Sequence, residues 1–373
     1  MFLIPYNRLS EEQKGIVRRI SREEKNLFVE GPPGSGKTLI SLYTLRDMVE
    51  EGTVRPLLLM YNHSLYGYLT TAMQELEISD NITIATKDKF FWDLAYQNSI
   101  DRKQGGSYGQ KYDYLLTKLL ECTLTTIYDV TVVDEVQDLS PKEWVLIKRL
   151  SKRITSLGDF NQGIYETKLT KDEIVGQGMM EKLTKIFRFH KNIAKIAALF
   201  SRTNDDLEAK VTKLSQTQPQ LIQVDKSQEF SEIKKILNSL KNMRQRIGII
   251  SPDRDVLDEL STYLTNQAVE FNYYQKNRDL RDHDFTSTVP LLISSYSAKG
   301  LEFEHVILFG FNKSSSMVLK LRNENRLKDI LYVSITRTNA NLYIMKTPDT
   351  ISELTNINLF ENIPPIQSGD DWF

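Results

Sequence analysis

The chain has 373 residues, of which 40% are hydrophobic and 26% charged, as is typical of a globular protein. Its 48 basic and 49 acidic residues leave a formal net charge of −1, which excludes a polybasic protein but not a local basic groove for nucleic acid. The single cysteine, Cys122, excludes an internal disulfide and disfavours a cysteine-based zinc site, so we expect a reducing, cytoplasmic environment.

Short apolar runs alternate with helical stretches through the first half of the chain. Leu27–Val29 is followed by a glycine-rich turn and a helix from about Lys37. In chain order we then expect a strand at 57–61 and a helix, a strand at 82–84 and a helix at 87–97, a loop at 101–110, a strand at 130–133, a helix at 141–150 and a strand at 154–157. This alternation predicts a parallel sheet with helices on both sides.

The second half repeats this pattern. We expect strands at 221–224, 247–250, 291–293, 306–309 and 342–345, helices at 230–240, 254–264 and 326–338, and loops at 203–220, 276–288 and 312–322. The sequence therefore predicts an α/β fold of two lobes, at 1–180 and 181–350, each with a mainly parallel sheet. We expect the remaining residues, 351–373, to form a flexible tail.

A phosphate-binding motif follows the first predicted strand. The pattern G-x-x-x-x-G-K-[ST] is matched by Gly31, Pro32, Pro33, Gly34, Ser35, Gly36, Lys37 and Thr38. A position between a strand and a helix is the context that such a motif requires, because the backbone N–H groups and the helix N-terminus then surround the phosphates. We therefore predict that Lys37 contacts the β- and γ-phosphates of ATP and that Thr38 binds Mg²⁺.

Two acidic residues end a strand that is expected to be buried. Asp134 and Glu135 directly follow the apolar run Val130–Val133. A carboxylate at this position is placed to hold Mg²⁺, and its neighbour can orient or deprotonate the attacking water. The pair favours nucleotide hydrolysis over nucleotide storage.

A set of motifs resembles the superfamily one helicases of the UvrD/Rep type. The string Asp134–Asp138 and the string Gly158–Tyr165 introduce the resemblance, and further matching stretches lie at 9–13, 186–188, 297–303 and 331–338. The motifs run in the family order over nearly the whole chain. The resemblance implies two RecA-like lobes with the ATP site in the cleft between them.

The resemblance also implies roles in binding the nucleoside. Gln13 would hydrogen-bond the adenine edge, and Phe187 would stack on the adenine face. Glu302 would contact the ribose.

Three further residues would respond to the γ-phosphate. The resemblance implies that Gln162 senses it and links it to the nucleic-acid groove, and that Arg188 and Arg337 act as arginine fingers. Positive charge around a transferring phosphoryl group stabilises the transition state. Closure of the cleft would then depend on ATP, and hydrolysis would release it.

The nucleic-acid contacts follow from the same resemblance. Tyr61, Asn62 and His63 occupy positions where the family places residues that bind the nucleic-acid strand. The stretch 297–303 matches the family's fifth motif, in which Tyr296 replaces the usual histidine. Tyr61 could stack on a base, a sequence-tolerant contact worth about 1–3 kcal/mol, or it could pack as core at the strand end. For Phe90–Phe91, in a region that the family also uses, we expect core packing.

The chain also departs from the family pattern. Thr167 stands where the family has a tryptophan used for base stacking. The spans from Tyr61 to Asp134 and from Arg188 to Lys299 are too short for the accessory subdomains of typical relatives. The last residues, 368–373, loosely resemble the acidic and aromatic tips of single-stranded DNA-binding proteins, although a plain disordered end is the simpler interpretation.

Two functions remain open from the sequence. The first is an ATP-driven motor on single-stranded DNA, with RNA not excluded and with the 3′-to-5′ travel that the motif type implies. A partner protein or self-assembly would supply an unwinding wedge. The alternative is a nucleic-acid-stimulated ATPase that acts as a gated clamp or regulatory subunit for a partner nuclease or effector. A P-loop kinase or GTPase is disfavoured, because it needs no second lobe carrying Arg188 and Arg337.

Overall fold

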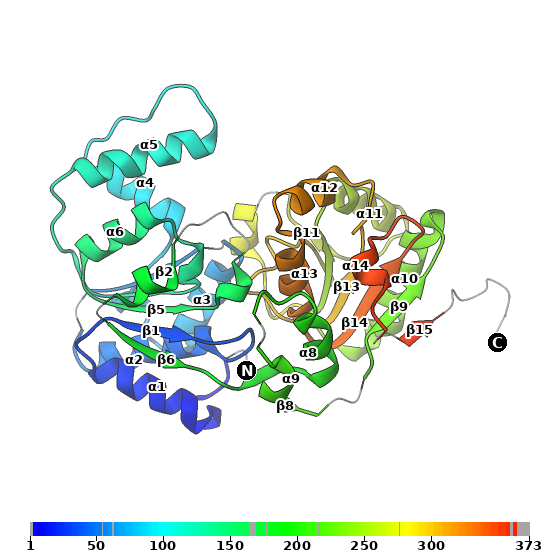
Figure 1. The fold of residues 1–373 in the computed structure, drawn as a ribbon, viewed down its shortest axis with the longest axis horizontal. Helices are drawn as coiled ribbons and strands as arrows, with labels where there is room; N and C mark the ends of the chain where they lie inside the picture. Colours follow the sequence, from blue (N-terminus) through cyan, green and yellow to red (C-terminus); the bar gives the residue numbers. More distant parts are fainter. Residues whose placement is uncertain are drawn as a thin grey trace. The chain divides into compact units, whose positions relative to one another are not determined.

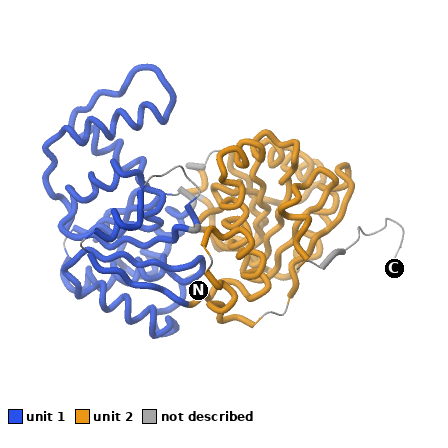
Figure 2. The backbone as a smooth tube through the Cα atoms, viewed as in Figure 1, with its two compact units in different colours: residues 1–184 blue, residues 185–373 orange. Residues whose placement is uncertain are grey.

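The computed structural model describes residues 3–53, 55–61, 63–163, 169–176, 178–203, 205–214, 217–275, 277–358 and 361–363. The chain divides into two compact units, Met1–Thr184 and Lys185–Phe373 (Figure 2). In the described ranges, no helix is both long enough and apolar enough to cross a membrane.

Unit 1 is built on a parallel sheet of six strands in the order β3-β2-β4-β5-β1-β6. The strands are β1 (Leu27–Glu30), β2 (Pro56–Met60), β3 (Thr83–Thr86), β4 (Tyr128–Val133), β5 (Ser151–Gly158) and β6 (Met179–Lys182). The helices are α1 (Glu11–Arg22), α2 (Lys37–Glu50), α3 (His63–Glu75), α4 (Lys87–Gln97), α5 (Tyr108–Glu121), α6 (Pro141–Leu150) and α7 (Lys171–Val175) (Figure 1).

Each face of this sheet carries its own apolar core. Because side chains alternate along a strand, Val29 of β1 packs with residues of α1, α2 and α3. Its neighbour Phe28 packs on the opposite face with residues of α4, α5 and α6. Figure 1 shows α4 and α5 as a helical pair extending from the rest of unit 1.

Unit 2 contains a parallel sheet of seven strands in the order β11-β12-β10-β13-β14-β9-β15, and a separate pair, β7 and β8. The strands are β7 (Ile186–His190), β8 (Val211–Lys213), β9 (Gln220–Gln223), β10 (Ile247–Ser251), β11 (Asn272–Tyr273), β12 (Leu291–Ser294), β13 (Phe303–Leu308), β14 (Thr338–Lys346) and β15 (Glu361–Ile363). The helices are α8 (Lys191–Ala198), α9 (Leu207–Lys210), α10 (Glu229–Leu240), α11 (Arg254–Asn266), α12 (Ser316–Asn323), α13 (Leu327–Ile335) and α14 (Ser352–Thr355).

The expected α/β fold, with mainly parallel sheets flanked by helices, is confirmed. Some local expectations differ from the structure. The predicted loop at 312–322 contains most of α12, whose first turn is capped by the Ser315 hydroxyl accepting from Val318 N–H. The predicted flexible tail at 351–373 contains α14, and also β15, which adds to β9 at the edge of the sheet. An edge strand offers unpaired backbone groups to such a segment.

Candidate active site

The phosphate-binding loop joins β1 to α2. Gly34 and Gly36 have φ angles of 76° and 91°, in the left-handed region that favours glycine. A Cβ atom at Gly36 would lie 2.3 Å from Nε2 of Gln13. Both the backbone angle and the close approach of Gln13 therefore require glycine at this position.

Polar groups inside the loop are suited to an anionic ligand. The Lys37 ammonium donates to the carbonyl oxygens of Gly31, at 2.8 Å, and Pro32, at 3.3 Å, and the residue is buried. The hydroxyl of Ser35 is also buried, and no hydrogen-bond partner for it occurs among the described residues. A buried polar atom normally has a partner, so this hydroxyl and the lysine fit phosphate oxygens.

Thr38 and Asp134 meet at the start of α2. Oγ1 of Thr38 donates to Oδ2 of Asp134 at 2.9 Å, and Asp134 is buried. Burial, and then the charge of Glu135, raise the pKa of Asp134 to about 6, although the Thr38 hydrogen bond and the Lys37 charge act in the opposite direction. A buried carboxylate beside a hydroxyl offers the oxygen ligands that Mg²⁺ prefers. These two residues could therefore hold the ion together with nucleotide phosphates.

Glu135 begins a hydrogen-bonded chain that joins the string Asp134–Asp138 to the string Gly158–Tyr165. Its backbone has a φ of 56°, which is unusual for a residue with a side chain. Nε2 of Gln137 donates to the Glu135 carboxylate, and Oε1 of Gln137 accepts from Asp159 N–H at 3.1 Å. Nε2 of Gln162 then donates to Oδ2 of Asp159 at 3.0 Å. The structure thus connects the predicted water-activating carboxylate to Gln162.

Gln13 connects the start of α1 to the phosphate-binding loop by hydrogen bonds. Its Oε1 accepts from Ser10 N–H at 2.9 Å, while the Ser10 hydroxyl accepts from Gln13 N–H, forming a capping box at the start of α1. Its Nε2 donates to the carbonyl oxygen of Ser35 at 2.8 Å. The adenine contact of Gln13 stays a prediction, and the observed contacts join α1 to the loop.

Unit 2 brings three predicted site residues together. The Arg188 guanidinium forms an ion pair with Glu302 and donates to the carbonyl oxygen of Thr336 at 3.2 Å. Burial alone would raise the pKa of Glu302, but the charge and hydrogen bond of Arg188 lower it overall, with help from the charges of Arg246 and Arg337. Glu302 therefore holds a negative charge against Arg188.

Arg337 lies inside unit 2, where it is 1% exposed. Its Nε donates to the carbonyl oxygen of Val333 at 2.9 Å and its Nη1 to that of Leu301 at 3.3 Å. Of the other predicted residues, Phe187 lies half-buried in β7. Tyr296 follows β12, with the Arg326 guanidinium 5.6 Å from its ring centroid.

The predicted strand-binding residues of unit 1 lie after β2. Tyr61 is half-buried, with the Lys87 ammonium 4.6 Å from its ring centroid. Asn62, the side chain of His63 and Thr167 lie outside the described part of the chain. Phe90–Phe91 is buried in the core of unit 1.

The sequence analysis did not single out several residues that connect or neighbour the predicted site residues. Gln137 and Asp159 carry the chain from Glu135 to Gln162, and they lie within the two strings that introduced the resemblance. Lys87 and Glu143 form a buried ion pair at 2.7 Å. The only local signal for Glu143 is the Ser-x-x-Glu spacing from Ser140, which predicts a capping box.

The comparison with protein families supports a P-loop domain in unit 1. A family model described as an AAA domain matches residues 13–168. This range covers less than half of the chain, and it includes the loop at 31–38 and the Asp134–Glu135 pair. No curated protein matches the chain.

The chain is also similar to solved helicase structures. The PRRSV helicase has 14% identity and a TM-score of 0.45, with 94% of this chain and 57% of that chain covered. The arterivirus nonstructural protein 10, a helicase, has 15% identity and a TM-score of 0.42, with 89% and 62% covered. The C-terminal domain of a possible DNA helicase from Lactobacillus plantarum WCFS1 has 16% identity and a TM-score of 0.36, with 47% and 98% covered. The chain thus spans less than two thirds of the length of the two viral helicases.

Proposed function

We propose that the chain is an ATP-dependent translocase of the UvrD/Rep type that moves along single-stranded DNA. The observation that carries the proposal is the hydrogen-bonded chain from Glu135 through Gln137 and Asp159 to Gln162. It joins a carboxylate suited to activating water with the residue that the motif resemblance assigns to sensing the γ-phosphate. A protein that only stores nucleotide has no need of such a connection.

The residues of unit 1 account for the hydrolytic step. Lys37 and the backbone of the loop would bind the ATP phosphates, and Thr38 and Asp134 would hold Mg²⁺, which when bound neutralises phosphate charge. Glu135 would accept the proton of the attacking water. The Gln137 amide orients that carboxylate by its hydrogen bond. The carboxylate is therefore already in place before the water is activated.

The residues of unit 2 would complete the reaction. We infer that Arg188 and Arg337 supply positive charge to the phosphoryl group as it transfers. Phe187 would stack on adenine, whose edge Gln13 would read, and Glu302 would contact the ribose. Dependence of these contacts on bound ATP would make hydrolysis change the arrangement that grips nucleic acid.

The proposed strand contacts are Tyr61, Asn62, His63 and Tyr296. An aromatic side chain offers a stacking surface to any base, so the expected binding is independent of base sequence. Travel in the 3′-to-5′ direction is proposed on the type of motif alone.

A gated clamp or regulatory ATPase is the second candidate. It is favoured by one observation, that the span between β3 and β4 consists of α4, α5 and their connections. A processive unwinding enzyme of this type would be expected to have a larger insertion there. The clamp would share the ATP site but would not move.

ATPase rates measured in parallel without nucleic acid, with single-stranded DNA, with single-stranded RNA and with duplex test the proposal. We expect single-stranded DNA to stimulate hydrolysis most. Displacement of a protein block from the 5′ end, but not the 3′ end, of a strand would support 3′-to-5′ movement. Stimulation without displacement would favour the clamp, and no stimulation by any nucleic acid would overturn both candidates.

A further inference from the structure

A buried carboxylate on α6 gathers donors from three parts of unit 1. The side chain of Glu143 is 1% exposed. Its Oε2 accepts from Ser140 N–H at 2.6 Å, and its Oε1 accepts from the Lys87 ammonium and the Tyr112 hydroxyl, each at 2.7 Å. Burying a carboxylate is unfavourable unless it is paired and hydrogen-bonded, and here each oxygen has a donor.

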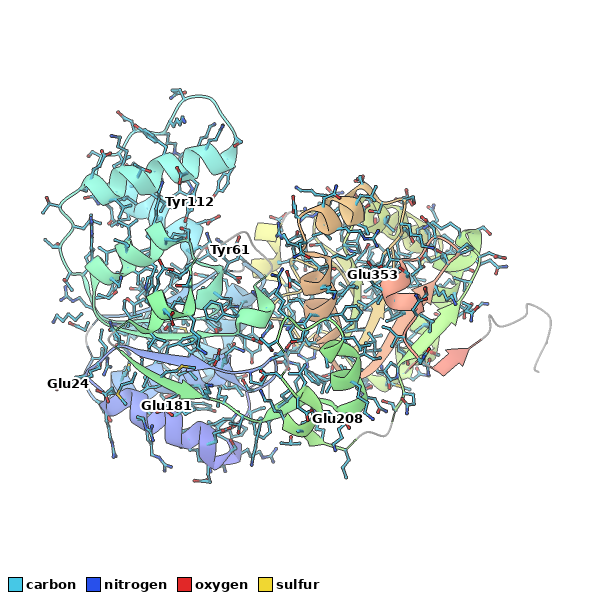
Figure 3. All side chains as sticks on the ribbon, in the orientation of Figure 1. Glu24, Tyr61, Tyr112, Glu181, Glu208 and Glu353 are labelled. Atoms are coloured by element: carbon cyan, nitrogen blue, oxygen red, sulfur yellow. The ribbon has the colours of Figure 1, made fainter. Side chains whose placement is uncertain are left out.

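The cation of this pair lies against two aromatic rings. The Lys87 ammonium is 4.6 Å from the ring centroid of Tyr61 and 5.1 Å from that of Tyr112, and a second carboxylate, Asp88, lies 3.4 Å away. Figure 3 labels the two tyrosines. A largely desolvated ammonium is attracted to the face of a tyrosine ring. Since Glu143 fixes the ammonium, it also fixes one neighbour of Tyr61.

Three residues of this cluster lie beyond the carboxyl ends of neighbouring strands. Tyr61 directly follows β2, Lys87 directly follows β3, and Ser140 follows the short turn after β4. These strands are adjacent and parallel in the order β3-β2-β4. Ligands of open parallel sheets bind beyond this edge. The ion pair therefore stabilises the edge of the sheet at which Tyr61 is expected to contact single-stranded DNA.

We propose that Glu143 is a positioning residue for nucleic acid, which acts through Lys87 to hold the ring of Tyr61 in its stacking position. This inference rests on the proposed function. The competing interpretation is that the pair only stabilises unit 1. The two differ in what they predict, because a purely stabilising pair would change the melting temperature without changing the affinity for a strand.

The test measures the oligo-dT concentration that half-saturates ATPase stimulation. Glu143→Gln keeps the shape of the side chain but removes the charge that holds Lys87. We expect the half-saturating concentration to rise about tenfold, within the range for the loss of one stacked base, with a much smaller change in the rate without DNA. Because the effect acts through Tyr61, Glu143→Gln should add little to Tyr61→Leu. Full additivity of the two changes would overturn the inference.

Asp329→Asn is the matched control. Asp329 lies in unit 2, its side chain is also 1% exposed, and it forms an ion pair with Arg202. The substitution breaks this ion pair, and it should lower the melting temperature without changing the half-saturating concentration. A shift equal to that of Glu143→Gln would show that loss of stability is the cause, and would overturn the inference. If Glu143→Gln does not fold, the half-saturating concentration is measured for Lys87→Met instead. In that variant Glu143 keeps Ser140 and Tyr112 as hydrogen-bond partners, so its carboxylate is not left unpaired.

The two proposals fail in different ways. An unmodified protein that oligo-dT does not stimulate would overturn the proposed function and this inference together. A stimulated protein whose Glu143→Gln and Lys87→Met variants keep the parental half-saturating concentration would overturn only the role of Glu143.

Discussion

The backbone N–H of Asp159 donates a 3.1 Å hydrogen bond to Oε1 of Gln137. Nε2 of the same Gln137 side chain donates to the Glu135 carboxylate. Gln137 packs closely against the backbone of the neighbouring residue, Gly158, because a Cβ atom at Gly158 would lie 2.6 Å from Oε1 of Gln137. Gln137 is therefore held in a single orientation, with its donor directed at the proposed general base.

Removal of this amide should slow hydrolysis without weakening ATP binding. In Gln137→Leu the Glu135 carboxylate loses the donor that orients it, and we expect kcat to fall about tenfold, which is less than the roughly 10²-fold or larger loss expected when a general base is removed altogether. The KM for ATP should stay within about twofold. The matched control is Gln97→Leu, at an exposed position on α4. A parental kcat in Gln137→Leu would contradict the orienting role.

Glu135→Gln should separate ATP binding from turnover. The substitution keeps the side-chain size and leaves Asp134 and Thr38 in place, but an amide cannot accept the proton. We expect kcat to fall by about 10²-fold or more, while ATP still protects the protein in thermal melts. Hydrolysis at the parental rate would show that another group is the base.

Lys37→Ala should abolish ATP hydrolysis and weaken ATP binding. Its ammonium is the side-chain cation inside the loop, at 2.8 Å from the carbonyl oxygen of Gly31, and its loss removes charge from both the bound state and the transition state. Lys171→Ala is the control, since it removes a lysine that pairs with Glu30 just before the loop. Titration with a fluorescent ATP analogue and a phosphate-release assay measure the two effects. Retained hydrolysis in Lys37→Ala would argue against the loop as the ATP site.

Arg188→Ala and Arg337→Ala should both lower kcat, but only the second should strongly destabilise unit 2. If they act as arginine fingers, we expect a loss on the order of 10³ in kcat at saturating single-stranded DNA. Arg337 is almost fully buried and donates to the carbonyls of Val333 and Leu301. The carbonyl of Val333 would keep the Thr336 hydroxyl as a donor, whereas a buried carbonyl left without a donor, as at Leu301, costs about 1–3 kcal/mol. Kinetics beside thermal melts distinguish the two effects, and an unchanged kcat with a raised KM would mean ground-state binding only.

Local patterns account for the parts of the fold that the sequence predicts well. The glycine-rich turn from Gly31 lies between β1 and α2 as expected, because the apolar run Leu27–Val29 indicates the strand and the phosphate-binding motif itself requires a helix after it. The strand β6 was not predicted, since Met179–Lys182 lacks a run of apolar residues. It forms because β1 offers a free edge, and Met179 to Lys182 pair with Leu27 to Glu30.

The contacts that join distant segments could not be predicted in the same way. Lys87 and Glu143 are 56 positions apart, and nothing local indicates the strand order, in which β3 and β4 lie on either side of β2. The capping box of Ser140 and Glu143 is visible in sequence, but its spacing predicts only a helix start. The second use of the carboxylate, as the partner of Lys87, depends on the order of the strands.

The isolated protein should hydrolyse ATP readily with single strands yet unwind duplex poorly. Opening a duplex costs about 1.4 kcal/mol per base-pair step, and a wedge must contact the junction. The described residues between β3 and β4 form only α4 and α5 with their connections, and those between β7 and β12 include strands of the unit 2 sheet. A partner or self-assembly would then have to supply the wedge. A tailed-duplex assay under single-turnover conditions, run beside block displacement on a single strand, tests this. Efficient opening of a long duplex by the monomer would contradict the prediction, and so would a failure to displace the block.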